Sequence, residues 1–417
     1  MKKLILVWII TSIYAQTANA LSQELHGYMR SGVGTNDKGG DQVCFSNPGA
    51  AGNEFRLGNE CSTYGEIAWS LMHMQGKGPN APFFKSQIRF AFAPNGHTNW
   101  EYANNTEGMA VRETFFEGGR FGGTPYTYWA GKRFYRENDL HMNDWYYFAD
   151  MSSNGAGMGH IPFMGGQLHL AWLREISSTE SDIGKHGVTV YDARLKELKL
   201  TDKTKGFVWL GYATAPAGKT STKVYEASDG YLAGLFLETG LASGFNHFAL
   251  MYGKGLLDDF NVYGSSALEA GSTAHKEQEA SNKIRIVEHI TYDWTNKLSF
   301  HASTSLELRD SGADNNNRTT WWNIGVQPMY FFSDHHQLVG VLGTSLIDAD
   351  GSSPKRLTRF TIAPQVSAGR NIWARPVIRL FYTRSWWSTS NKGSVGGTTY
   401  AGETSGASYG VQGEVWF

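Results

Sequence analysis

The chain has 417 residues, with 37 Lys and Arg against 38 Asp and Glu, so its net charge is close to zero. This balance argues against a nucleic-acid-binding protein, which usually carries a basic excess. Aromatic residues make up 14 % of the chain and glycines number 49, a composition typical of β proteins with one apolar face per strand.

The first twenty residues have the layout of a secretory signal peptide. Lys2 and Lys3 give a basic start, an apolar stretch follows, and Ala20 ends a small-residue cleavage motif. The apolar stretch is too short to favour the alternative, a membrane anchor. We expect residues 1–20 to be removed and residues 21–417 to form one domain. Beyond the signal peptide no run of about eighteen apolar residues occurs, which excludes helical membrane spans.

The mature chain opens on a predicted strand at residues 25–33. Its odd positions are apolar or small, whereas its even positions carry His26, Tyr28 and Arg30. Because side chains alternate between the two faces of a strand, the even set shares one face. If the odd face meets lipid or a neighbouring subunit, Tyr28 and Arg30 point into a lumen.

Two cysteines follow, Cys44 and Cys61. An exported chain with a single cysteine pair usually forms one disulfide, which we predict here. Two buried thiols are the alternative. A metal site is poorly supported, because neither cysteine has a nearby Cys or His as a second ligand.

The same alternation recurs along the chain, and polar, glycine-rich segments separate its occurrences. Short turns that alternate with long polar loops are typical of transmembrane barrels. The predicted strands are 64–70, 83–94, 126–134, 166–173, 206–213, 231–241, 246–253, 283–294, 298–308, 321–332, 337–347, 357–369 and 375–387. The long loops are predicted at 152–160, 264–281, 310–318 and 388–408.

The chain ends in a strand at residues 410–417, in which Gln412, Glu414 and Trp416 lie opposite Val415 and Phe417. The first and last strands can then pair and leave no sheet edge. A large secreted soluble β protein would explain the alternation. It would not explain the regular bulky apolar side chains opposite charged ones, or the aromatic terminus. These features favour an all-β transmembrane barrel.

Several short stretches, spread in order over the mature chain, form a recognisable set. They read HGYMRSG (26–32), RLGNEC (56–61), WAGKRFY (129–135), DLHM (139–142), WW and PMY (321–330) and IWARP (372–376). Together they resemble the maltoporin family, the carbohydrate-selective trimeric porins of the outer membrane. The stretch at 177–230 resembles the family only loosely.

The resemblance implies an antiparallel barrel of about eighteen strands, a number expected to leave an aqueous channel. It also implies a homotrimer in the outer membrane, with a long loop folded into each pore. Sugars and membrane lipid would be the partners, and no cofactor, metal, nucleic acid or catalytic step is implied. The long surface loops permit an additional role as a phage receptor.

In the family, an aromatic slide guides the sugar. The matching residues are Tyr28, Tyr64, Trp100, Phe245, Trp373 and Trp416. Strand alternation independently places five of them opposite the apolar face. Trp100 falls in an inferred loop and, by the resemblance, comes from the neighbouring subunit. For any single aromatic, lipid packing or an interfacial girdle is the alternative.

The resemblance also implies a polar track that binds sugar hydroxyls. Its residues are Arg30, Arg56, Glu66, Arg112 and Asp144, with Tyr146 at the constriction. Arginine suits this role because its planar fork donates to adjacent hydroxyls and stays charged. For Arg56 and Asp144, a salt bridge that anchors a loop explains the residues equally well.

One departure from the family bears on the substrate. Glu137 stands where maltoporins carry an arginine, and Arg136 precedes it. Either a shift by one residue restores the positive charge, or the constriction is more acidic and prefers another sugar. We favour passive diffusion of maltodextrin-type oligosaccharides. The alternatives are a porin for another sugar, a general porin, or a barrel enzyme, for which no Ser/His/Asp set of recognisable spacing is visible.

Overall fold

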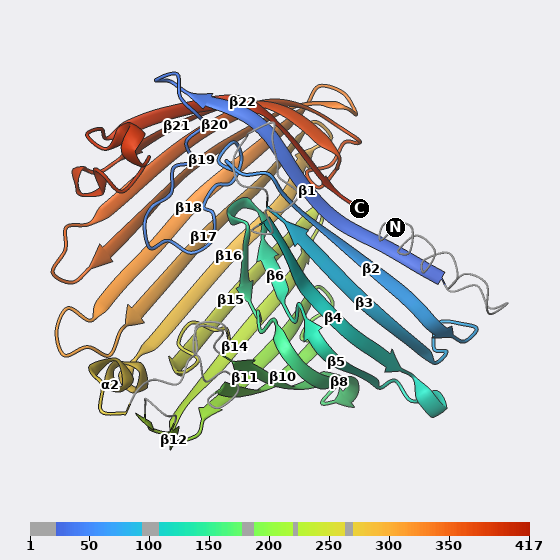
Figure 1. Cartoon of the computed structure of the whole chain (residues 1–417). Helices are drawn as coiled ribbons and strands as arrows, with labels where there is room; N and C mark the ends of the chain where they lie inside the picture. Colours follow the sequence, from blue (N-terminus) through green and yellow to red (C-terminus); the bar gives the residue numbers. More distant parts are fainter. Residues whose placement is uncertain (1–21, 94–107, 177–186, 220–223, 263–269) are drawn as a thin grey trace, which may run out of the picture.

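The computed structural model describes residues 22–93, 108–176, 187–219, 224–262 and 270–417. Its main element is a closed barrel of eighteen antiparallel strands, which confirms the predicted fold class (Figure 1). The strands are β1 (Ser22–Asn36), β2 (Tyr64–Gln75), β3 (Phe83–Phe92), β4 (Met109–Gly119), β5 (Thr127–Arg133), β8 (Ser153–Phe163), β9 (Gly166–Ile176), β10 (Gly187–Lys199), β11 (Thr204–Ala215), β14 (Ser228–Leu241), β15 (Gly244–Gly255), β16 (Asn282–Thr295), β17 (Leu298–Asp310), β18 (Arg318–Phe331), β19 (His336–Ala349), β20 (Lys355–Ser367), β21 (Val377–Trp387) and β22 (Ser405–Trp416). The predicted signal peptide lies outside the described residues.

The first and last strands close the barrel. Tyr28 of β1 lies directly opposite Trp416 of β22, and the register continues along both strands. Beyond the last pair, Gly27 and Phe417 exchange two backbone hydrogen bonds of 2.8 and 3.1 Å. Every barrel strand therefore has a partner on both sides, so no row of unpaired backbone groups faces the membrane.

Strand alternation sorts the side chains between membrane and lumen. On β21, Ile378 and Leu380 are 59 % and 58 % exposed on the outer wall, whereas Arg379 between them is 5 % exposed. The same division runs around the barrel and produces an apolar outer band. The inner face carries the polar and charged residues, which places them where a solute would pass.

Three strands of the barrel were not predicted from the sequence: β4, β8 and β10. Residues 152–160 were expected to be a loop, but they form most of β8. The inner positions of β8 are glycines because other side chains occupy the space. A Cβ on Gly157 would come within 2.4 Å of Trp129 Nε1, and one on Gly155 within 2.7 Å of Leu173. Because neighbouring side chains cover its inner face, the sequence of β8 lacks the apolar–polar alternation by which a strand is recognised.

Residues 37–63, here called the first inner segment, connect β1 to β2 and lie against the inner wall. The predicted disulfide joins Cys44 to Cys61, with Cα atoms 5.9 Å apart. Phe55 is fully buried and covers Gly343, where a Cβ would approach its ring to 2.3 Å. Glu54 accepts hydrogen bonds from Trp321 and Asn323 of β18 and from Ser345 of β19. These contacts fix the segment to β18 and β19.

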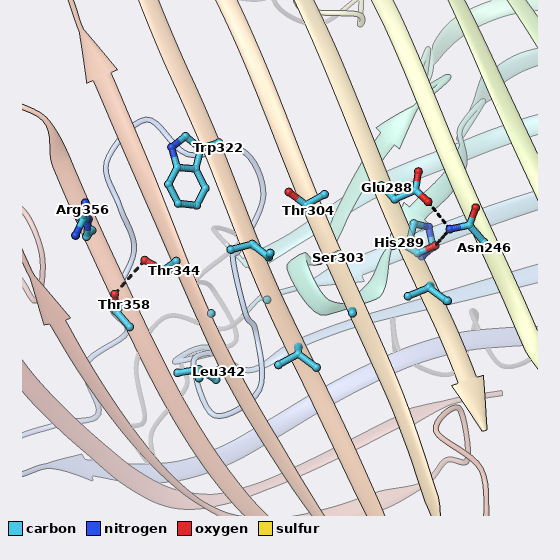
Figure 2. A pocket seen from close by; sticks show the side chains of 16 residues that line it. Asn246, Glu288, His289, Ser303, Thr304, Trp322, Leu342, Thr344, Arg356 and Thr358 are labelled. Carbon is cyan, nitrogen blue, oxygen red and sulfur yellow. Dashed lines mark hydrogen bonds between the residues drawn. The ribbon is translucent and has the colours of Figure 1, made fainter. Parts of the chain in front are cut away.

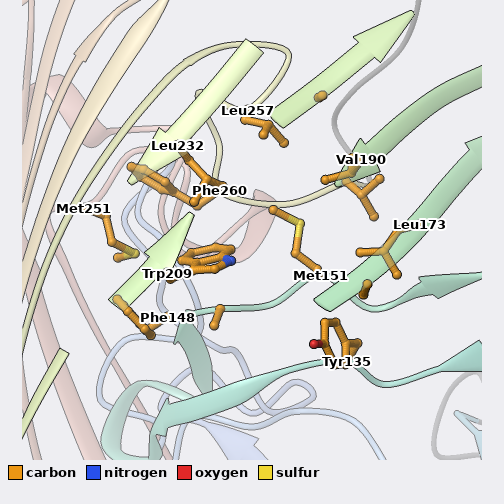
Figure 3. Packing of buried hydrophobic residues seen from close by; sticks show 14 of the residues in the cluster. Tyr135, Phe148, Met151, Leu173, Val190, Trp209, Leu232, Met251, Leu257 and Phe260 are labelled. Carbon is orange, nitrogen blue, oxygen red and sulfur yellow. The ribbon is translucent and has the colours of Figure 1, made fainter. Parts of the chain in front are cut away.

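Residues 134–152, the second inner segment, connect β5 to β8. They include β6 (Glu137–Leu140), the 3-10 turn His141–Asn143 and β7 (Trp145–Phe148). Phe148 and Met151 are fully buried against inward-facing side chains such as Trp209 and Met251 (Figure 3). The segment therefore crosses the interior of the barrel and is held there by apolar packing.

The remaining elements are short. They comprise β12 (Gly218–Lys219), β13 (Val224–Tyr225), α2 (Thr273–Ala280) and 3-10 turns at Phe121–Gly123, Thr389–Asn391 and Thr398–Tyr400. Ser272 caps α2 by accepting a hydrogen bond from the backbone of His275. Among the described residues, no helix has the length and apolar character needed to cross a membrane.

Candidate functional site

A cavity of about 950 Å³ opens inside the barrel, between the wall and the two inner segments. Most residues that the sequence assigned to the slide and the track line it. They are Tyr28, Arg30, Arg56, Tyr64, Glu66, Arg112, Asp144, Tyr146, Trp373 and Trp416. Phe245 lies next to this set rather than in the lining, and Trp100 lies outside the described residues.

One side of the cavity begins with three aromatic rings. The rings of Tyr64 and Tyr28 have centres 6.2 Å apart, and Tyr28 lies opposite Trp416 in the sheet register. Each ring points inward because it occupies the polar face of an alternating strand. The barrel closure itself therefore brings the ends of the chain together at this wall.

The row of rings continues through the second inner segment. His141 lies between Trp416 and Trp373, with ring centres 5.5 and 5.4 Å away. Trp373 in turn lies nearly parallel to Phe245, at 6.5 Å between centres and 18° between planes. The five predicted aromatics that the structure describes thus form one series, in which His141 bridges Trp416 and Trp373.

Sequence reasoning did not assign a role to His141, although it quoted the DLHM stretch that contains it. Arg56 and Arg375 each place a guanidinium nitrogen 3.2 Å from one of its ring nitrogens. Burial, reinforced by Arg56, holds the pKa of His141 well below its usual value. The ring is therefore neutral at pH 7 and behaves as part of the aromatic row.

The first inner segment supplies the central ion pairs. Arg30 donates to Glu60 at 2.5 Å and to Asp144 at 3.2 Å. Arg56 also donates to Glu60, at 2.9 Å. Asp144 remains exposed, whereas Glu60 is buried. Glu60 was not predicted, although it lies in the RLGNEC stretch, and it positions both arginines at the cavity wall.

Glu414 is a second unpredicted centre of charge. Its carboxylate accepts hydrogen bonds from Arg56 and Arg375 at 2.8 Å and from Arg379 at 2.7 Å. Tyr28 donates to the same group at 3.1 Å. The residue shares its strand face with Trp416, which is the signal that could have identified it.

A further charged group lies on β2, β3 and β4. Arg89 donates to Glu66 at 3.1 Å and to Glu113 at 2.5 Å. Gln87 also donates to Glu113, at 2.8 Å, and Tyr64 donates to Glu66. Donors and acceptors therefore alternate along the wall next to the aromatic row. Such alternation matches the alternating hydrogen-bond needs of a polyhydroxylated solute.

Two arginines reach the cavity without a carboxylate partner among the described residues. The guanidinium carbon of Arg136 lies 4.0 Å from the centre of the Phe134 ring and 3.9 Å from that of Tyr146. The guanidinium carbon of Arg112 lies 5.2 Å from the centre of the Phe134 ring. Stacking on rings leaves their donor groups available to a solute.

Glu137 points away from this cavity. Its carboxylate pairs with Arg194 at 3.1 Å and with Lys196 at 2.6 Å on β10. Burial opposes its ionisation, but the two cations outweigh burial and lower the pKa of Glu137. Of the two readings left open by the sequence, the structure favours the one in which Arg136 supplies a positive charge. The cavity lining contains Arg136 and not Glu137.

A separate hollow of about 840 Å³ lies on the outer wall (Figure 2). Outward-facing side chains such as Trp322, Leu342 and Thr344 line it, and Thr344 shares a 3.0 Å hydrogen bond with Thr358. Because these side chains point toward the membrane, the hollow is no part of the path through the barrel. Within the described ranges, no cluster of three or more His, Cys, Asp or Glu side chains is placed to hold a metal ion.

Comparison with known proteins gives one family and a set of similar folds. Residues 23–417 match the family model described as LamB porin. The outer membrane channel DcaP of Acinetobacter baumannii is 8 % identical, with 96 % of this chain and 99 % of that chain covered and a TM-score of 0.50. A BenF-like porin from Pseudomonas fluorescens Pf-5 is 10 % identical, with 95 % and 99 % covered and a TM-score of 0.49. At such identities the likeness to these structures concerns the fold alone.

Proposed function

The chain belongs to the LamB porin family of outer-membrane β-barrels, and from this premise we propose that it is a sugar-selective porin for maltodextrin-type oligosaccharides. Transport is passive, because the solute moves down its own gradient and no catalytic step or cofactor is involved. One observation carries the proposal. A row of aromatic rings, which runs through the central cavity and ends beside it at Phe245, accompanies alternating hydrogen-bond donors and acceptors.

Sugar chemistry explains why this arrangement suits an oligosaccharide. The faces of a pyranose ring carry C–H groups that pack on aromatic planes, and its rim carries hydroxyls that bind charged side chains. Tyr64, Tyr28, Trp416, Trp373 and Phe245 supply the planes. A solute that moves along them replaces each contact by a similar one, so binding at any position stays weak enough to permit release.

The polar side of the path divides into fixed and available groups. Arg30 and Arg56 are held by Glu60, so they present an ordered surface rather than mobile charges. Arg112, Arg136 and the exposed Tyr146 line the cavity and are proposed to bind sugar hydroxyls directly.

We further propose that three barrels associate and that Trp100 of one subunit extends the slide of its neighbour. Family membership supports the trimer. Tyr64, the first ring of the row, lies at the start of β2, directly after the long connection 37–63, so a further ring from outside the barrel could extend the row there. An added tryptophan would lengthen the path toward the extracellular side.

Planar-bilayer conductance, titrated with a panel of sugars, tests the proposal. Maltose and longer maltodextrins are expected to block the ion current in a saturable manner, with affinity rising with chain length. A current blocked by sucrose but not by maltodextrins would assign the porin to another sugar. A current unaffected by any sugar would leave only a general porin and would contradict the proposed selectivity.

A further inference from the structure

The hollow on the outer wall of the barrel extends from Asn246 on β15 to Arg356 on β20 (Figure 2). Small outward-facing side chains, among them Ala302, Thr304 and Thr344, line it together with larger ones. Elsewhere the outer wall carries bulky apolar side chains. A run of small side chains within such a band leaves room for a molecule that approaches from the membrane.

The polar side chains in this hollow find their partners within the wall. Thr344 and Thr358 share a hydrogen bond of 3.0 Å, and Thr304 donates to a backbone carbonyl of β18 at 2.8 Å. At the other end, Asn246 donates to the carboxylate of Glu288. Because these hydroxyl groups are already hydrogen-bonded, the threonines add little polar surface, and the hollow suits a hydrocarbon chain.

One end of the hollow carries a cation. Arg356 is the second residue of β20, its side chain is exposed, and it has no carboxylate partner among the described residues. The connection 350–354 before it lies at the same end of the barrel as the long connections 37–63 and 388–404. In outer-membrane barrels the long connections are extracellular. Arg356 therefore lies at the extracellular rim, at the level of lipid head groups.

The depth of the hollow matches one leaflet of the membrane. Thr304 is the middle residue of β17, so the hollow descends from the rim at Arg356 to about half the height of the wall at Thr304. Half of the hydrocarbon core, which is about 30 Å thick, is the depth of one leaflet. This part of the hollow is therefore long enough for one acyl chain of the outer leaflet.

The hollow also lies on the side of the barrel that faces lipid in the proposed trimer. The connection between β3 and β4 contains Trp100, which is proposed to reach the neighbouring subunit. In the closed order of eighteen strands, β17 lies nine strands from β4 and is therefore opposite to it. A neighbouring subunit that docks at the β3–β4 side leaves the hollow open to the membrane.

We propose that this hollow binds one acyl chain of a phosphorylated lipid of the outer leaflet, whose phosphate pairs with Arg356. A guanidinium group suits a phosphate because its planar fork donates two parallel hydrogen bonds. Within the membrane, packing rather than the hydrophobic effect drives the association, so the shape of the hollow determines the affinity. The site lies outside the path of the sugar and does not depend on the proposed selectivity.

Native mass spectrometry of the full-length channel in detergent, titrated with lipid A and with its dephosphorylated form, tests the site. The wild type should bind lipid A about fivefold more tightly, the scale of one basic side chain at an anionic membrane surface. Arg356→Gln should abolish this preference. Thr344→Phe, which fills the hollow, should weaken the binding of both lipids severalfold. Sugar block should stay unchanged in both variants.

Arg318→Gln is the matched control, because Arg318 is an exposed arginine that begins β18 at the same end of the barrel but lies outside the hollow. Equal losses in Arg318→Gln and Arg356→Gln would overturn the site, since binding would then reflect general surface charge. Undiminished binding in Thr344→Phe would overturn it as well. Assemblies larger than a trimer that disappear in Thr344→Phe would assign the hollow to a second copy of the chain instead. A wild-type channel that no sugar blocks would contradict the sugar-porin function and leave the lipid site standing.

Discussion

Arg136 holds its guanidinium carbon 3.9 Å from the centre of the Tyr146 ring. The two residues belong to the second inner segment, ten positions apart in the chain, and both line the central cavity. The next residue, Glu137, turns to the opposite side and pairs with β10. These adjacent residues therefore have different surroundings. Arg136 lines the cavity, whereas Glu137 forms ion pairs with the barrel wall.

Neutralising Arg136 and neutralising Glu137 should have different effects on sugar affinity and on stability. Arg136→Gln removes a donor that is stacked on Tyr146 and free of carboxylate partners among the described residues, so sugar block should weaken severalfold, or by about 1 kcal/mol. Glu137→Gln should leave sugar affinity within about twofold but lower thermal stability, since the buried Arg194 loses one of its two carboxylates. Bilayer titration and thermal denaturation of the two variants would measure both effects. Equal loss of sugar affinity in the two variants would contradict this division.

Trp416→Ala tests the aromatic row. Removing a ring that faces the cavity should weaken sugar block by on the order of 1 kcal/mol. Conductance without sugar should hold or rise slightly, because the lumen becomes wider. Phe417→Ala is the counterpart, since Phe417 packs near Gly27 at the barrel closure. It should impair assembly and, because Phe417 also borders the cavity, lower the sugar affinity of assembled channels by less than Trp416→Ala does. The reverse pattern would mean that the register of β22 is wrong by one residue.

Glu414→Gln should destabilise the channel and disorder its polar wall. Three arginines share this carboxylate, and loss of a buried charge partner typically costs on the order of 3 kcal/mol. We expect a lower midpoint in denaturant unfolding and a shift of ion selectivity toward anions, measured as a reversal potential in a salt gradient. An Arg379→Gln exchange in the same protein should restore part of the stability. Wild-type selectivity in Glu414→Gln would argue against the role of this cluster in the pore.

The disulfide should support the first inner segment rather than the barrel. Peptide mapping without reductant should recover Cys44 linked to Cys61. Replacing both by serine should cost about 3 kcal/mol in the chain-entropy model. Because Arg56 and Glu60 lie in the same segment, the variant should also show noisier current at unchanged mean conductance. Two free thiols in outer-membrane material would refute the linkage.

Gel migration tests the proposed trimer. Unboiled samples should migrate on detergent gels as three chains and fall to one chain after heating. Trp100→Ala should keep the oligomer and weaken sugar block, because the residue is proposed to act in a neighbouring pore. A stable monomer with undiminished sugar affinity would contradict both points.

Strand alternation allowed much of the barrel to be predicted from the sequence. It located β1, β22 and most strands between them, because one face of each meets lipid and the other meets the lumen. It failed at β8, where Gly155 and Gly157 make room for neighbouring side chains. Alternation reports exposure to two different environments, and a strand covered on its inner face no longer displays that contrast.

The site was predictable only where a side chain belongs to a strand or to a recognised motif. Tyr28, Tyr64 and Trp416 follow from strand parity. The opposed directions of Arg136 and Glu137 do not, because packing of Phe148 and Met151 against distant strands sets the course of that segment. Likewise, nothing local indicates that Glu414 would meet Arg56 of the first inner segment, Arg375 just before β21 and Arg379 on β21.

The position of Glu414 on the last strand has a consequence for biogenesis. Its partners Arg56, Arg375 and Arg379 belong to parts of the chain that precede it, so they lack this counter-ion until β22 docks. Docking of the final strand therefore completes the hydrogen bonding between β22 and its neighbours and brings one shared carboxylate to three arginines in the same event. Before β22 docks, Arg375 and Arg379 lack this carboxylate, so closing the barrel removes the cost of leaving their buried charges without it.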